Sequence, residues 1–119
     1  MNHKNQGIAK RFTYAKNGLV EAFRREDSLR TQVYCGVGVV IFCIVMRPPA
    51  MWCALFVLAS AAVLSLELLN TALEAQMDRM HPEIHPEIGF AKDCLAAAVL
   101  IASGAAITVF LAFLFWRFF

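Results

Sequence analysis

The sequence predicts an all-α integral membrane protein with three transmembrane helices that follow an N-terminal amphipathic surface helix. The chain has 119 residues, and 60% of them are hydrophobic. A soluble domain this short could not bury so much apolar surface. The apolar residues are also grouped in three blocks, at residues 31–46, 50–66 and 94–116, each close to the ~20 residues that cross a bilayer as a helix. We therefore treat residues 1–119 as a single membrane domain.

Residues 8–25 are expected to form the surface helix. Large apolar side chains recur there at helical spacing, at Ile8, Phe12, Leu19, Val20 and Phe23. Basic side chains lie between them, at Lys10, Arg11, Lys16, Arg24 and Arg25. A helix with one apolar and one basic face suits the surface of an anionic leaflet. An ordinary solvated basic N-terminus is the alternative, but three following spans already hold this segment at the bilayer.

The transmembrane helices are expected at residues 31–46, 50–69 and 94–116, and the basic residues orient them. Most of these precede the first span, at Lys4, Lys10, Arg11, Lys16, Arg24, Arg25 and Arg30. The loop after the second span adds Arg79 and Lys92, whereas Arg47 stands alone in the first loop. Because Lys and Arg are enriched on the cytoplasmic side, we expect the N-terminus and the 79–93 loop in the cytoplasm. The Arg47 turn and the C-terminus are then outside.

The N-terminus lacks the apolar core of a cleavable signal, so the chain is expected to insert through its own spans. The four cysteines lie in or beside the apolar blocks without a CxxC pair, which favours packing over disulfide or metal roles. The loop after the second span repeats the sequence HPEI, at residues 81–84 and 85–88. Proline disfavours a helix there, so we expect a turn-forming loop up to Gly89 and a third helix that opens with Lys92 and Asp93.

The most informative feature is a polar stripe directly after the second apolar block, formed by Glu67, Asn70, Glu74 and Asp78. These residues are spaced i, i+3, i+7 and i+11, so on a helix they share one face about 16 Å long. Ionisable groups at membrane depth are costly and usually serve a function. The alternative is that the carboxylates reach the headgroups and pair there with nearby Lys and Arg.

The helix ends on the cytoplasmic side hold the parts of a phosphoryl-transfer site. The carboxylates of Glu26 and Asp27 before the first span are expected at the same depth as the stripe and Lys92. Carboxylate oxygens suit Mg²⁺, which usually takes one or two of them together with substrate phosphates. A lysine can neutralise a phosphate, and a further carboxylate can act as general base. No GxxxxGK[ST], GxGxxG or protein-kinase motif is present, so an ATP site must be built in another way.

At this stripe the sequence resembles a known family. The segment ELLNTALEAQMD at residues 67–78 resembles the signature of the prokaryotic diacylglycerol kinases and the related undecaprenol kinases, which are small integral membrane lipid kinases. The segment AKD at residues 91–93 and the Gly18–Arg30 segment also resemble family patterns. The resemblance covers essentially the whole chain. Departures are Gly7 and Gln32, where the family often has an arginine and a glutamate, and they bear on nucleotide affinity.

The resemblance implies a homotrimer in the bacterial inner membrane, with sites shared between neighbouring subunits and with ATP and Mg²⁺ as cofactors. It implies that Glu67 is the general base, that Asn70 acts beside it, and that both contact the lipid together with Arg30. It implies that Glu26 and Glu74 hold the metal. The nucleotide contacts that it implies are Tyr14, Glu26, Glu74, Glu83, His85, Lys92 and Asp93.

We expect the γ-phosphoryl group of ATP to be transferred to the hydroxyl of diacylglycerol, giving phosphatidate, at the cytoplasmic membrane interface. Undecaprenol is the alternative acceptor. A small ion-coupled transporter, with Glu67 as the coupling carboxylate, predicts a site near the midplane of the membrane. A non-enzymatic membrane subunit leaves the stripe unexplained. No nucleic-acid partner is expected.

Overall fold

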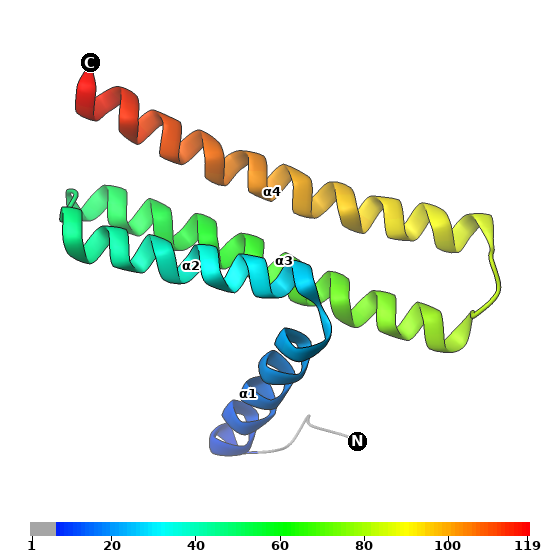
Figure 1. Cartoon of the computed structure of the whole chain (residues 1–119). Coiled ribbons are helices and arrows are strands. Elements are labelled where there is room, and N and C mark those ends of the chain that lie inside the picture. The colour runs from blue at the N-terminus through cyan, green and yellow to red at the C-terminus, as the bar shows by residue number, and fades with distance from the viewer. Residues whose placement is uncertain (1–6) are drawn as a thin grey trace.

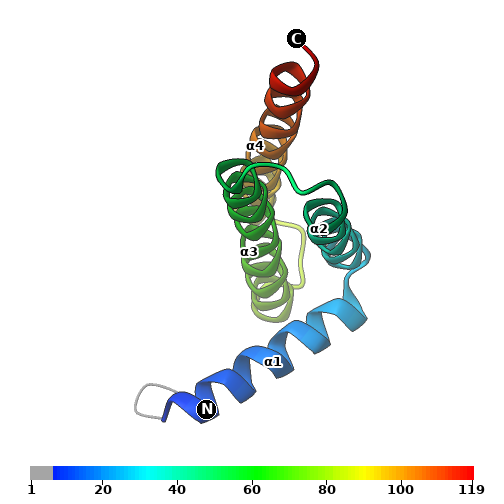
Figure 2. The same ribbon diagram turned by 90° about the vertical axis from the view of Figure 1, so that its left-hand side faces the viewer.

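The computed structural model describes residues 7–119, so Lys4 lies outside the described residues. The chain forms four helices, α1 (Ile8–Arg25), α2 (Asp27–Met46), α3 (Ala50–Met80) and α4 (Pro86–Phe118). The last three run along one another as a bundle, whereas α1 leaves the bundle at a steep inclination (Figures 1 and 2). Each of α2, α3 and α4 is long and apolar enough to cross a membrane. The predicted all-α class with three such helices is confirmed.

The amphipathic helix α1 is joined to α2 by a tight elbow. Glu26 is extended between the two helices, and its backbone N–H donates to the carbonyl of Ala22 at 2.9 Å. The Arg30 guanidinium donates to the carbonyls of Phe23 and Arg24, at 2.9 Å each, and pairs with Asp27. The last carbonyls of a helix have no partner within it, and a cation there is favourable. Arg30 therefore fixes the direction in which α1 leaves the bundle.

Few side chains are buried within a single chain. The buried apolar residues of the three long helices are Leu29, Phe56, Val63 and Phe113. Large apolar side chains along all three helices are exposed, as is Ile8 at the start of α1. Such surface is stable only where lipid or another protein covers it. The layer of three helices is thus suited to a membrane and leaves apolar faces open to neighbours.

The start of α4 differs from the sequence prediction. We predicted a loop up to Gly89 and a helix opening with Lys92 and Asp93, but α4 already begins at Pro86. Proline is favoured in the first helical position, because the N–H that it lacks would have no partner there. The preceding His85 caps the helix, since its Nδ1 accepts a hydrogen bond from the backbone N–H of Glu87 at 3.1 Å.

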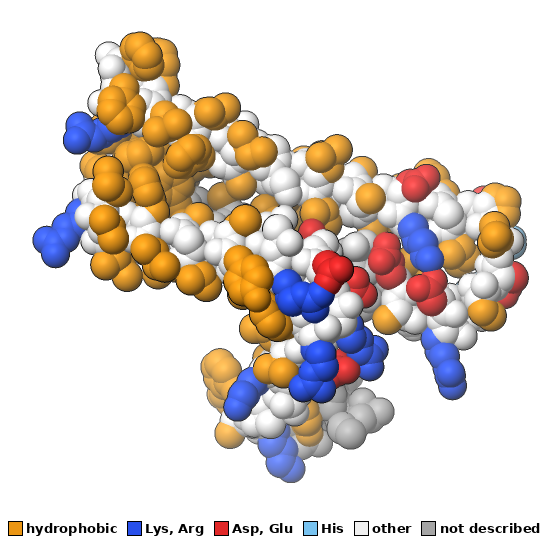
Figure 3. Space-filling model, in the orientation of Figure 1, with side chains coloured by type: hydrophobic (Ala, Val, Ile, Leu, Met, Phe, Trp, Pro, Cys, Tyr) orange, Lys and Arg blue, Asp and Glu red, His pale blue; other side chains and the backbone are white. Residues whose placement is uncertain are grey.

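Charged side chains are unevenly distributed over the molecule. On the face shown in Figure 3, acidic and basic groups gather at the end where α3 passes into α4 and over α1. The opposite end, where α2 turns into α3, is largely hydrophobic with basic groups at its edge. Since α3 continues without a break to Met80, it carries the whole polar stripe into the charged end.

Candidate active site

Among the charged residues that the structure describes, Glu67 alone is buried, with only 5% of its surface exposed. It lies on α3 where the apolar segment gives way to the polar stripe. The hydroxyl of Ser28, in the first turn of α2, donates a hydrogen bond to Oε2 of Glu67 at 3.3 Å. A buried carboxylate is costly unless it is hydrogen-bonded. Glu67 is thus held in place by one hydrogen bond from α2.

Asn70 lies about one turn further along α3. Its Oδ1 atom is buried and accepts no hydrogen bond from any residue that the structure describes. Buried polar atoms in folded proteins nearly always have a partner, so such an atom calls for an explanation. A water molecule or a substrate group beside the carboxylate would be a hydrogen-bond donor of the required kind.

Lys92 and Asp78 join α4 to the end of the stripe. The Lys92 ammonium donates to Oδ1 of Asp78 at 2.6 Å, and both side chains remain partly exposed. Lys92 precedes the apolar segment at residues 94–116. The hydrogen bond with Asp78 and the nearby carboxylate of Glu74 raise the pKa of Lys92 above its ordinary value, although partial desolvation opposes this. The lysine is therefore charged and faces the stripe.

The stripe makes contact with two different helices at two levels. Glu67 contacts α2 through Ser28, whereas Asp78 contacts α4 through Lys92. At 1.5 Å per residue these levels lie about 16 Å apart along α3. The sequence predicts that these groups meet at one depth. The structure separates them because α2 begins at Asp27, beside Glu67, while α3 and α4 continue beyond it.

Two residues of the described chain have carboxylates that suit a metal ion. Glu26 and Glu74 are half-buried, and no described residue forms a hydrogen bond or ion pair with either side chain. Over residues 7–119 no three His, Cys, Asp or Glu side chains gather closely enough to hold a metal by themselves. Mg²⁺ does not need such a cage, since it commonly takes one or two carboxylates and completes its shell with phosphates and water. Each of these two carboxylates is therefore of the kind that suits Mg²⁺ arriving with a nucleotide.

The remaining candidate residues are dispersed in one protomer. Glu83 lies 3.4 Å from His81 in the loop, and His85 caps α4. Asp93 is exposed, whereas Tyr14 is half-buried on α1. Arg30, which we expected at the lipid, is occupied by the elbow between α1 and α2. A single chain thus brings together Glu67 with α2 and Lys92 with the end of the stripe, but it does not gather all the candidates around one cavity.

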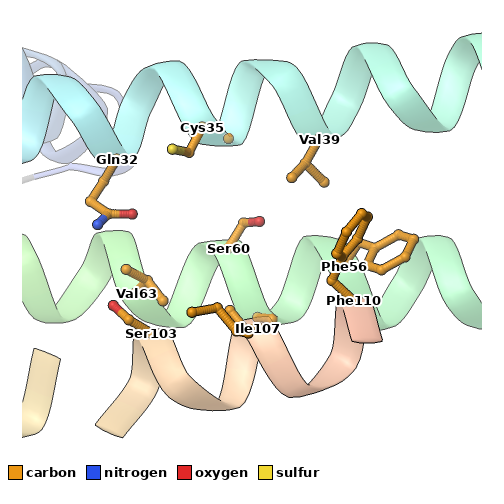
Figure 4. Close-up of a pocket in the computed structure, with 12 residues that line it drawn as sticks. Gln32, Cys35, Val39, Phe56, Ser60, Val63, Ser103, Ile107 and Phe110 are labelled. Carbon is orange, nitrogen blue, oxygen red and sulfur yellow. The ribbon is translucent and has the colours of Figure 1, made fainter. Parts of the chain in front are cut away.

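A cavity of about 380 Å³ lies between α2, α3 and α4, in the membrane-spanning part of the bundle (Figure 4). Gln32 and Ser103 lie at its end near Val63, one helical turn from Glu67, and Ser60 lies midway along it. Its other end is formed by Phe56 and Phe110. A cavity that is polar toward the buried carboxylate and aromatic away from it can hold a molecule with a hydroxyl at one end and a hydrocarbon tail.

Sequence reasoning missed Ser28. A serine two residues after Glu26 is an unremarkable residue in a first helical turn, where serine is common. Its role is visible only once α2 is docked against α3 and the hydroxyl reaches Glu67.

The chain is similar to known proteins along most of its length. Residues 13–114 match the family described as prokaryotic diacylglycerol kinase. The chain is 38% identical to the diacylglycerol kinase of Synechocystis sp. over 99 residues, which cover 82% of the chain and 57% of that protein. It therefore spans little more than half the length of this relative.

Two further relatives are covered more fully. The diacylglycerol kinase of Escherichia coli (strain K12) is 34% identical over 95 residues, with 80% of this chain and 78% of that protein covered. The undecaprenol kinase of Bacillus subtilis (strain 168) is 31% identical over 103 residues, with 84% and 83% covered.

Proposed function

This chain belongs to the prokaryotic diacylglycerol kinase family, and from that premise we propose that it is an ATP-dependent lipid kinase. It transfers the γ-phosphoryl group of ATP to the hydroxyl of diacylglycerol and releases phosphatidate and ADP. The observation that carries this proposal is the burial of Glu67 at the end of the apolar part of α3. A carboxylate at that place meets a lipid hydroxyl at the membrane interface.

In the proposed reaction Glu67 acts as general base. The lipid hydroxyl donates its proton to the free oxygen of Glu67, while Ser28 holds the other oxygen. The hydroxyl oxygen then bonds to the γ-phosphorus, and the bond from that phosphorus to the β,γ-bridging oxygen of ADP breaks. The lipid has one hydroxyl proton and Glu67 takes it, so Asn70 is proposed to act beside the base by orienting the reacting groups.

Lys92 is proposed to bind the γ-phosphate. Its ammonium group is held at the end of the stripe by Asp78 and lies near Glu74. Its charge stabilises the negative charge that shifts toward the transferred phosphate oxygens in the transition state. Asp93 and Tyr14 are proposed nucleotide contacts, together with Glu83 and His85 in the neighbouring loop.

Glu26 and Glu74 are proposed to hold Mg²⁺. Within the described residues neither carboxylate forms a hydrogen bond or a direct ion pair, and both suit a hard cation. Bound Mg²⁺ neutralises phosphate oxygens and aligns them for transfer.

We propose that the active form is a homotrimer in which neighbouring chains complete each site. Two features support this: the apolar faces left open on α2, α3 and α4, and the separation of Glu67 from Lys92 within one chain. A neighbour that packs on an open face can supply the nucleotide-binding end beside the Glu67 of another chain. The proposed location is the bacterial inner membrane, with the N-terminus in the cytoplasm and the C-terminus outside.

Undecaprenol is the second candidate acceptor, favoured by the match to the Bacillus subtilis undecaprenol kinase over 84% of the chain. The same base and the same phosphate contacts would serve either alcohol. The cavity of about 380 Å³ between the three long helices has room for only the first part of either hydrocarbon chain, so it does not distinguish the two acceptors.

A direct competition distinguishes the two acceptors. Purified protein in mixed micelles is given γ-labelled ATP with equal mole fractions of diacylglycerol and undecaprenol, and the lipid products are separated by chromatography. We expect label predominantly in phosphatidate. Label mainly in undecaprenyl phosphate would show that undecaprenol, and not diacylglycerol, is the preferred acceptor. Label in neither lipid would contradict the kinase proposal.

A further inference from the structure

The end of the bundle opposite the candidate active site is built from aromatic rings. We call it the aromatic end, and it lies where α2 turns into α3 and where α4 finishes (Figure 1). Trp52 packs against Phe113 at 5.6 Å and against Trp116 at 5.8 Å between ring centroids, and Phe42 lies 5.8 Å from Phe113. Tryptophan at the end of a membrane-spanning bundle is typical of the headgroup level of a bilayer. This places the aromatic end at a membrane surface.

A cavity of about 480 Å³ opens at this end, between the turn that follows α2 and the last turns of α4. This is within the range of about 300–1,000 Å³ that is common for small-ligand sites. Its lining is apolar, with Phe42, Pro49 and Trp116, except for two cationic side chains, Arg47 and Arg117. The cavity thus combines an apolar wall with two positive charges.

The guanidinium groups of Arg47 and Arg117 belong to exposed residues at the aromatic end. Over residues 7–119 no hydrogen bond or ion pair joins the side chain of Arg47 or Arg117 to another residue. Two other arginines near helix ends are paired, Arg25 with Glu21 and Arg30 with Asp27. The exposed Arg79 in the last turn of α3, like Arg47 and Arg117, has no such pair within the described residues. No acidic residue occurs between Asp27 and Glu67 or after Asp93. The two positive charges at the aromatic end are therefore open to an anion from outside the chain.

Arg47 is also held in a backbone conformation that L-residues rarely adopt. Its φ and ψ are 48° and 55°. Among the described residues other than glycine, Arg47 alone has a positive φ. The conformation ends α2, because the backbone N–H of Arg47 donates to the carbonyl of Cys43 at 3.1 Å. Glycine or asparagine would serve this cap at lower cost. The two prolines that follow Arg47 restrict the backbone of this turn, so the arginine side chain starts from a rigid position.

We propose that the cavity at the aromatic end binds an anionic phospholipid from the leaflet that it meets. The phosphate lies between Arg47 and Arg117, and the first methylenes of the acyl chains lie on Phe42 and Trp116. Arginine suits this ligand because its planar fork binds phosphate oxygens in a bidentate manner. The site lies at the far end of the bundle from Glu67 and Lys92, and it does not depend on the proposed kinase activity.

The test is lipid retention measured by native mass spectrometry of the purified protein. Phosphatidylglycerol and phosphatidylcholine with identical acyl chains are titrated against the detergent-solubilised protein. We expect selective retention of phosphatidylglycerol, at one molecule per chain. The double variant R47Q/R117Q should lose about tenfold or more in affinity, because it removes hydrogen bonds to a charged group. The variant R47K/R117K keeps both charges, so it should retain the preference with weaker binding.

The matched control is Arg79→Gln. Arg79 is exposed near the other end of α3, and its side chain has no hydrogen bond or ion pair within the described residues. Its loss should leave phosphatidylglycerol retention unchanged. Equal retention of both lipids, or equal loss in Arg79→Gln and R47Q/R117Q, would overturn the site. So would displacement of the lipid by millimolar inorganic phosphate, which would identify a soluble anion as the ligand. Absence of any lipid from an intact oligomer would mean that a second chain covers the cavity.

Discussion

Replacing Glu67 with glutamine tests the proposed general base with little change in shape. Glutamine is isosteric with glutamate, and its amide oxygen can still accept the hydrogen bond that Ser28 donates to Oε2 at 3.3 Å. The buried position, with 5% exposure, therefore keeps its packing. What disappears is the ability to take a proton from the lipid hydroxyl.

The expected losses in turnover and in stability differ in size. Loss of a general base is typically worth roughly 10²–10⁴-fold in rate, which is about 2.7–5.4 kcal/mol of transition-state stabilisation at ~1.36 kcal/mol per tenfold. The hydrogen bond from Ser28 is weakened but not removed, which costs about 1 kcal/mol or less in folding free energy. A catalytic role therefore predicts a large fall in kcat with a thermal midpoint close to that of the parent.

The assay measures kcat and KM for ATP in mixed micelles, with ATP binding followed separately by a fluorescent analogue. Ser28→Ala is the matched control, because it removes only the hydrogen bond to Glu67. We expect that control to lose about tenfold or less in kcat. Near-parental kcat in Glu67→Gln, or equal losses in Glu67→Gln and Ser28→Ala, would refute Glu67 as the base.

Three further predictions concern other parts of the account. Lys92→Ala should lower kcat roughly 10²–10³-fold, and Lys92→Arg should also be costly because the point charge is displaced; free substitution by arginine would show that Lys92 only forms an ion pair. Glu26→Ala and Glu74→Ala should each raise the Mg²⁺ concentration that gives half-maximal activity. If both variants reach half-maximal activity at the same Mg²⁺ concentration as the parent protein, Glu26 and Glu74 do not hold the metal together. In a background without the four native cysteines, cysteine at position 48 should react with an impermeant thiol reagent outside whole cells and cysteine at position 84 should not; the reverse pattern would invert the proposed orientation.

The sequence was sufficient to predict the helices because their apolar blocks are long and separated by prolines and charges. It placed the start of α4 too late, since it treated Pro86 as a helix breaker. Proline breaks a helix only where its missing N–H is needed, and the first helical position does not need it. The cap by His85 that makes this start favourable is a side-chain contact with no strong sequence signal.

The sequence predicts that the polar stripe lies on one helix, but it does not predict which neighbouring helices the stripe contacts. The spacing of Glu67 and Asp78 correctly places both on one continuous helix, α3. It cannot reveal which helix lies beside each of them, because that depends on where α2 begins and how far α4 extends. Ser28 and Lys92 became the partners of these two carboxylates only through that packing. Contacts between neighbouring chains depend on how whole chains pack against one another, and they stay a prediction.

The measurement that tests the central claim most directly is phosphoryl transfer itself. Purified protein in diacylglycerol-containing micelles is incubated with Mg²⁺ and ATP labelled at either the α- or the γ-phosphate, and Glu67→Gln is run in parallel. The account predicts label in extracted phosphatidate from γ-labelled ATP alone, one ADP for each phosphatidate formed, and a signal in Glu67→Gln that falls by at least about a hundredfold. ADP formation without labelled lipid, or transfer that is undiminished in Glu67→Gln, would contradict it.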